Sequence, residues 1–312
     1  LNHADSLLTL GGTVTIGKAS VTASSNTGKG LAINISSTIS SLTVLADTEL
    51  NIADGITLSG ATEISSGTTL TLSSTGTFGS TLNLSGTLEA GANLTVSGLI
   101  SVSGNSAVSI PAAGTTLTYS GGNLNVGAHT LSIGGAGTLS NATGSPLVLD
   151  VADSILSLTG NGIISGPVKL ESGTLKSTGS PTVSGALTQS GDTTIDVLAN
   201  KTLTYSGAPF SLGANTLTLT GGGTLVSGGL DLNNADSKLL LNSITVDSVS
   251  TTIDNSLGVD VDNDSTITSL SVSNITPVSI ASGKTLSGAI TLTAGSINLD
   301  ETGTLASTVE MS

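Results

Sequence analysis

The segment Thr116-Leu117-Thr118-Tyr119-Ser120-Gly121 decides the fold, because it returns unchanged as Thr202-Leu203-Thr204-Tyr205-Ser206-Gly207. The two copies lie 86 residues apart (202 minus 116), and the match continues in register from Gly127-Ala128-His129-Thr130-Leu131 to Gly213-Ala214-Asn215-Thr216-Leu217. Self-similarity of this kind is the signature of a repeat architecture. Each unit of such a chain packs mainly on its neighbours, so function is expected in a surface or an assembly rather than in one pocket.

A shorter unit recurs more often: Ala, then Asp or Asn, two further residues, and Leu or Ile leading into a strand-like pattern. Its copies are Ala4-Asp5-Ser6-Leu7, Ala46-Asp47-Thr48-Glu49-Leu50, Ala152-Asp153-Ser154-Ile155, Ala199-Asn200-Lys201-Thr202-Leu203 and Ala235-Asp236-Ser237-Lys238-Leu239. Asp and Asn favour turns, because their side chains bond the backbone two residues on and tolerate unusual φ angles. We predict that each copy is a corner from which the next strand departs.

Short alternating triplets dominate the rest of the chain, and helical periodicity is almost absent. Examples are Leu42-Thr43-Val44, Leu70-Thr71-Leu72, Leu82-Asn83-Leu84, Leu94-Thr95-Val96 and Leu131-Ser132-Ile133. Such alternation places two apolar side chains on one face of a strand and a small polar one on the other. Gly, Ser, Asn and Asp lie between the triplets, as turns require. The pattern predicts an all-β protein.

The spacing of the strands favours a solenoid over a sandwich. The triplets centred on Thr118, Asn125 and Ser132 follow one another every seven residues, which is closer than the 8–12 residues typical of hairpin-linked sandwiches. Aromatic residues are 1% of the chain, whereas sandwich cores usually contain large rings. We predict a parallel β-helix of roughly 14 coils of about 21–24 residues, four coils making the 86-residue offset and the whole spanning on the order of 65–70 Å. We predict one continuous domain over residues 1–312.

The charge of the chain excludes several kinds of partner. The net charge is −14, from 21 acidic residues against seven lysines and no arginine. Neutralising phosphates requires a basic surface, so neither a nucleic acid nor an anionic lipid surface is expected as a partner. No apolar run is long enough for a membrane-spanning helix, so membrane insertion is not expected. The absence of cysteine excludes disulfides and thiolate metal sites.

One stretch gathers many of the acidic residues: Asp231, Asp236, Asp247, Asp254, Asp260, Asp262 and Asp264, with Lys238 as its one lysine. Asp260, Asp262 and Asp264 alternate, as in the opening of a calcium loop, and would share one face of a strand. Ser265 and Ser271 replace the glycine and the glutamate that such a loop requires at positions six and twelve. We interpret the stretch as a solvated acidic face, with weak calcium binding as the alternative, and assign no metal ligand.

Other chemistry has little support in the sequence. His3 and His129 are far apart, and His129 takes the position of Asn215 in the repeat, which indicates a corner residue. A polysaccharide-cleaving enzyme would need a pair of carboxylates in one cleft, and the chain has no Trp or Arg to line sugar subsites. Ice binding would need aligned Thr-x-Thr pairs, yet pairs such as Thr69/Thr71 and Thr116/Thr118 recur at irregular intervals. We therefore predict a protein that is not an enzyme, without catalytic residues or cofactor.

Two runs of the sequence resemble the repeats of bacterial autotransporter passengers and related large adhesins. They are Gly213-Ala214-Asn215-Thr216-Leu217-Thr218-Leu219-Thr220-Gly221-Gly222-Gly223-Thr224-Leu225 and Gly114-Thr115-Thr116-Leu117-Thr118-Tyr119-Ser120-Gly121-Gly122. The resemblance implies a parallel β-helix displayed outside the cell. Residues 7–10 and 297–299 read as ordinary repeats rather than as caps. We therefore expect either flanking repeats in a longer chain or end-to-end stacking of copies.

These observations predict a non-enzymatic extracellular structural protein: a β-solenoid surface stalk, an adhesin segment or a filament subunit. Its partners would be flanking repeats or further copies of itself. The first alternative is a β-helix module that binds a cell-surface glycan or a host protein. The second alternative is a polysaccharide-active β-helix enzyme.

Overall fold

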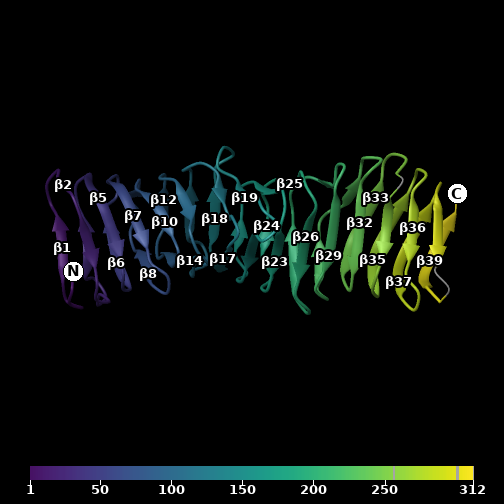
Figure 1. Ribbon diagram of the computed structural model, residues 1–312, viewed down its shortest axis with the longest axis horizontal. Coiled ribbons are helices and arrows are strands. Elements are labelled where there is room, and N and C mark those ends of the chain that lie inside the picture. The colour runs from purple at the N-terminus through teal and green to yellow at the C-terminus, as the bar shows by residue number, and fades with distance from the viewer. Residues whose placement is uncertain (256, 300–301, 312) are drawn as a thin grey trace. The chain divides into compact units, whose positions relative to one another are not determined.

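The computed structural model describes residues 1–255, 257–299 and 302–311, and these residues form strands and turns without any helix. The chain divides into two units: unit 1 comprises Leu1–Val148 and Ile155–Pro167, and unit 2 comprises Leu149–Ser154 and Val168–Ser312. Each unit is a β-solenoid in which successive coils stack strand upon strand (Figure 1). The predicted fold class is confirmed.

The first sheet receives one strand from each coil. In unit 1 its order is β1 (Leu7–Leu10), β4 (Gly30–Ile33), β6 (Thr48–Ile52), β8 (Thr69–Leu72), β11 (Thr87–Ala90), β14 (Ser106–Ile110), β17 (Thr130–Gly135), β20 (Ile155–Leu158). In unit 2 its order is β23 (Thr174–Ser177), β26 (Thr193–Val197), β29 (Thr216–Thr220), β32 (Lys238–Asn242), β34 (Gly258–Val261), β36 (Pro277–Ile280), β38 (Ser296–Leu299). The described chain therefore makes about 15 coils, against roughly 14 predicted.

The second sheet faces the first across the interior. In unit 1 it contains β2 (Thr15–Ile16), β3 (Ala19–Val21), β5 (Ser37–Val44), β7 (Thr57–Ile64), β9 (Thr77–Phe78), β10 (Thr81–Leu84), β12 (Leu94–Val96), β13 (Ile100–Val102), β15 (Thr116–Tyr119), β18 (Thr138–Asn141) and β21 (Ile163–Ile164). In unit 2 it contains β24 (Thr182–Val183), β27 (Thr202–Tyr205), β28 (Phe210–Ser211), β30 (Thr224–Val226), β31 (Leu230–Leu232), β33 (Thr245–Thr251), β35 (Ser265–Val272), β37 (Thr285–Leu292) and β39 (Thr304–Met311). Shorter pairs join β16 (Leu124–Asn125) to β19 (Leu147–Leu149), and β22 (Val168–Leu170) to β25 (Leu187–Gln189).

Aliphatic ladders fill the interior of each unit. Leu31, Leu50 and Leu72 pair in register on consecutive coils, and none is more than 2% exposed. In unit 2, Leu217, Leu239 and Val259 form the equivalent ladder, each fully buried. Burying such side chains stabilises a fold by about 1.5–3 kcal/mol each. The alternation read from the sequence is therefore the alternation between interior and solvent.

The 86-residue offset corresponds to four coils. Between Thr116 and Thr202 the chain adds β17, β20, β23 and β26 to the first sheet. Tyr119 and Tyr205 have the same structural role in their copies: the hydroxyl of Tyr119 accepts the N–H of Ile100 at 3.3 Å, and that of Tyr205 accepts the N–H of Leu187 at 3.3 Å. Burial raises the pKa of Tyr119, against the smaller opposite effect of the bond from Ile100.

Coil length varies more widely than the sequence predicted. One coil leads from Thr71 to its in-register partner Glu89 and is shorter than the predicted range, whereas another leads from Ser132 to its partner Ser157 and is longer. The paired strands keep their register in both cases. The segments between the paired strands take up the difference.

The Ala-Asp/Asn unit forms corners, as predicted. Four copies are centred on a turn closed by a backbone bond, from Ser6 N–H to His3 O, Ser154 N–H to Val151 O, Lys201 N–H to Leu198 O and Ser237 N–H to Asn234 O, at 2.9–3.0 Å. Asn200 adopts a left-handed φ of 62°. Asp47 of the remaining copy instead bonds the following coil, accepting the N–H of Thr69.

A second internal repeat relates the two units at an offset of 228 residues (265 minus 37). Ser37-Thr38-Ile39 and Thr57-Leu58-Ser59-Gly60-Ala61 in unit 1 match Ser265-Thr266-Ile267 and Thr285-Leu286-Ser287-Gly288-Ala289 in unit 2. In both pairs the register shifts after the isoleucine. Gly60 and Gly288 lie at these shifts with φ of 126°. A side chain at either position would collide with the carbonyl oxygen of the isoleucine on the preceding coil.

We expect Gly60→Ala to destabilise unit 1 by at least about 2 kcal/mol, because alanine is strained at this φ and its Cβ meets a backbone atom. Gly11→Ala is the matched control, since its Cβ meets nothing within 4 Å, and we expect a change within about 0.5 kcal/mol. Urea denaturation followed by circular dichroism measures both. Equal midpoints for the two variants would contradict the steric argument.

Candidate functional site

The structure disperses the alternating aspartates that suggested a calcium site. Strand β34 ends at Val261 and β35 begins at Ser265, so Asp260, Asp262 and Asp264 do not share one strand face. Asp260 forms an ion pair of 2.7 Å with Lys238 on the preceding coil. The expectation of a shared face is wrong, because a corner interrupts the alternation. Within residues 1–255, 257–299 and 302–311, no three His, Cys, Asp or Glu side chains come together as a metal site.

The histidines lie where the sequence placed them, far apart in the fold. His129 directly precedes β17, as Asn215 directly precedes β29, so the predicted corner role is confirmed. His3 lies in an exposed turn and accepts the N–H of Asp5 at its Nδ1 atom, at 3.2 Å. Over the part of the chain that the structure describes, no helix has the length and apolarity needed to cross a membrane.

Asp247 links two coils of unit 2 through hydrogen bonds. Its carboxylate accepts the N–H and the hydroxyl of Ser227, the N–H of Gly228 and the N–H of Ser248, at 2.8–3.0 Å. Burial alone would raise the pKa of Asp247, but these hydrogen bonds together outweigh it and lower the pKa below the ordinary 3.8. Asp247 therefore acts in the fold rather than as part of a binding surface.

A different bond recurs at the corners of both units. An outward Asp, Asn or Ser accepts the backbone N–H of the threonine that begins a Thr-Leu strand on the next coil. The acceptor–donor pairs are Ser36–Thr57 (3.1 Å), Asp47–Thr69 (2.7 Å), Asn93–Thr116 (2.7 Å), Asn105–Thr130 (2.9 Å), Ser180–Thr202 (3.2 Å), Asp192–Thr216 (2.7 Å) and Asp264–Thr285 (2.8 Å). We call these the corner bonds. The recurring Thr-Leu dipeptide marks strand starts but does not by itself reveal the corner bonds, because other Thr-Leu strands begin with an N–H that donates to a backbone carbonyl, as at Thr87 and Thr138.

Outward hydroxyls form ladders across consecutive coils. In unit 1, Thr57, Thr77, Thr95, Thr118 and Ser140 pair in register along the second sheet. In unit 2 the corresponding ladder is Thr202, Thr224, Thr245, Thr266 and Ser287. The intervals between Thr-x-Thr pairs are irregular in the sequence, and these ladders align single hydroxyl residues rather than such pairs.

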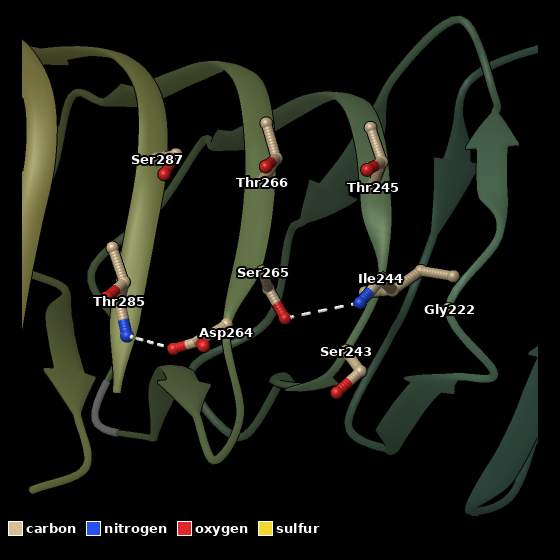
Figure 2. Close-up of a pocket in the computed structure, with 9 residues that line it drawn as sticks. All are labelled: Gly222, Ser243, Ile244, Thr245, Asp264, Ser265, Thr266, Thr285 and Ser287. Atoms are coloured by element: carbon tan, nitrogen blue, oxygen red, sulfur yellow. Dashed lines mark hydrogen bonds between the residues drawn. The ribbon is translucent and has the colours of Figure 1, made fainter. Parts of the chain in front are cut away.

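Part of the unit 2 ladder lines a groove of about 470 Å³. Figure 2 shows Thr245, Thr266 and Ser287 in one row and Ser243, Asp264 and Thr285 in a second row, on three adjacent coils. Ser265 lies between the rows and is buried, its hydroxyl accepting the N–H of Ile244 at 3.3 Å. Smaller grooves of the same construction surround Asp192 in unit 2, with about 370 Å³, and Asn105 in unit 1, with about 280 Å³. These surfaces can donate and accept hydrogen bonds; the Asp264 and Asp192 grooves each contain one carboxylate, and the Asn105 groove contains none.

We expect Asp192→Ala to destabilise unit 2 by about 1–2 kcal/mol, because the N–H of Thr216 loses its acceptor. Asp192→Asn should cost less than about 0.5 kcal/mol, since Asn93 and Asn105 make the same bond at other corners. Asp153→Ala, in an exposed turn, is the control and should be neutral. Denaturant midpoints of the three variants provide the test, and equal losses for Ala and Asn at position 192 would contradict it.

Asp247→Asn should destabilise the protein near pH 7 by about 1–3 kcal/mol, because charge-assisted bonds are lost. The folded-state pKa of Asp247 is lowered below 3.8, so its contribution is fully present above 3.8 and is lost as the pH falls through the folded value. The stability difference between wild type and variant should therefore shrink below that pH. Urea midpoints measured across this range test the sign; a difference independent of pH would refute it.

Comparison with known proteins finds no family model, no curated protein and no solved structure that matches this chain. The β-solenoid class therefore rests on the strand pairing and register of the chain itself. The chain is a β-helix repeat protein.

Proposed function

We propose that this chain is a non-enzymatic extracellular structural protein, acting as a β-solenoid stalk or adhesin segment at a cell surface, or as a filament subunit. The observation that carries the proposal is the continuous ladder of parallel strand pairs through each unit. Eight first-sheet strands in unit 1, at about 4.8 Å per step, extend that unit by about 34 Å along its stacking direction. Such a unit is suited to act as a spacer.

The interior of each unit supports a mechanical role. Coils are fastened to their neighbours by strand hydrogen bonds and aliphatic ladders, and some of them also by corner bonds. Each coil contacts only its neighbours. A force along the stacking direction would therefore act on many of these contacts at once. A stalk or filament needs this property along its whole length.

The exterior supports an extracellular setting. Its outward strand positions are mostly Thr, Ser and Asn, and the chain has seven lysines and no arginine. Trypsin-like proteases therefore have few cleavage positions. The Gly-Thr-Leu-rich runs at 114–122 and 213–225 resemble those of autotransporter passengers and adhesins, which are displayed outside the cell. In this role the partners are flanking repeats or further copies stacked end to end.

The proposal predicts slow proteolysis under native conditions and a stiff particle. We expect the chain to stay essentially intact during prolonged trypsin digestion, while a urea-unfolded sample is cleaved at its lysines. Electron microscopy of the purified protein should show fibres if copies stack, and separate rods if the chain is a stalk. Rapid native cleavage, or flexible particles without a stacking axis, would contradict the structural role.

A further inference from the structure

We propose that the groove around Asp264 binds a neutral polysaccharide chain through hydrogen bonds. This assignment is independent of the structural role proposed above, since a surface stalk functions with or without a ligand. The groove is built from two rows of polar side chains: Thr245, Thr266 and Ser287 in the first, and Ser243, Asp264 and Thr285 in the second (Figure 2). The register fixes the first row, because Thr245 pairs with Thr266, and Thr266 with Ser287.

The hydroxyls of the groove are available to a ligand. Among the described residues, the side-chain oxygens of Thr245, Thr266 and Ser287 take part in no hydrogen bond. All three residues are also partly exposed, so a ligand can reach them. Each hydroxyl both donates and accepts, so the row suits a ligand that also does both. Adjacent members lie about 4.8 Å apart along the stacking direction. A row of this kind fits a chain-like ligand better than a single small molecule.

The carboxylate of Asp264 is held in place at the centre of the second row. One of its oxygens accepts the N–H of Thr285 at 2.8 Å. The fold requires only an acceptor at this corner, because the amide oxygens of Asn93 and Asn105 make the same bond elsewhere. The fold therefore does not require the charge of Asp264 or its second carboxylate oxygen. A fixed carboxylate oxygen is a strong acceptor for ligand hydroxyls.

The charge and composition of the lining select the class of ligand. The nine lining residues carry one formal charge, which is negative, and the chain as a whole carries −14. Anionic polymers, including nucleic acids and acidic polysaccharides, are therefore repelled. One carboxylate is too few for a calcium site, which takes six to eight oxygen ligands. The lining has no aromatic ring, so recognition depends on hydrogen bonds, and we expect dissociation constants in the millimolar range for short oligosaccharides.

Titration of the isotope-labelled protein with cellohexaose, mannohexaose and maltohexaose, followed by NMR, tests the assignment. At least one probe should shift the amide signals of Thr245, Thr266, Thr285 and Ser287 in a saturable way. Oligogalacturonate, an anionic probe of similar length, should leave these signals unchanged.

Two variants and one control locate the site. Asp264→Asn keeps the corner bond and should weaken binding by about tenfold, because it removes the charged acceptor. Thr266→Val keeps the shape of the side chain and should also weaken binding. Thr224→Val, in the same hydroxyl ladder but outside the groove, should bind like the wild type. Unchanged melting temperatures confirm that all three fold.

The proposal is overturned if none of the neutral probes shifts the groove signals. It is equally overturned if a probe binds but neither Asp264→Asn nor Thr266→Val weakens that binding. Failure of either kind would leave the proteolysis and microscopy results, which test the structural role, unaffected.

Discussion

The rest of this structure depends on the hydrogen bond that the first N–H of a Thr-Leu strand makes with the preceding coil. The first backbone N–H of a strand that begins at a corner has no acceptor within the preceding turn. A buried N–H without an acceptor costs free energy. In both units there are corners where an Asp, Asn or Ser on one coil accepts that N–H from the next, at 2.7–3.2 Å. At other Thr-Leu strands, such as those that begin at Thr87, Thr138 and Thr174, a backbone carbonyl of the preceding coil accepts it. Each bond sets where a Thr-Leu strand begins. The following leucine then points inward, and the alternation of the strand follows from it.

Coils of different length stack because their paired strands keep the same register. The coil that starts at Thr71 is shorter than the coil that starts at Ser132, yet the aliphatic ladders and the outward hydroxyl ladders remain in register. The interior consists mainly of Leu, Ile and Val, and the four aromatic side chains of the sequence, Phe78, Tyr119, Tyr205 and Phe210, are buried among them. The exterior presents aligned rows of hydroxyls, and where a corner carboxylate lies beside such a row, as at Asp264, the fold creates a polar groove.

Much of this organisation could be predicted from the sequence, because it is local or repeats at a fixed offset. The Leu-x-Leu triplets predicted the strands, the Ala-Asp units predicted the corners, and the repeated hexapeptide placed Tyr119 and Tyr205 at equivalent positions. Long-range register could not be predicted, because corner length varies. A corner separated Asp260, Asp262 and Asp264, which alternation had placed on one face. The repeat that contains the Gly60 and Gly288 bulges has a fixed offset of 228 residues (288 minus 60), so it could have been read from the sequence. The Asp264 groove needs three coils in register, so no local pattern reveals it.

Native-state hydrogen exchange measured by NMR tests the role of the corner bonds most directly. The amides of Thr69, Thr116, Thr130, Thr216 and Thr285 begin strands, where amide hydrogens would otherwise exchange quickly with solvent. If the corner bonds hold the coils, these amides exchange about as slowly as those in the middle of the same strands. Exchange at the rate of exposed turn amides, with the strand centres still protected, would show that the coils are held without them.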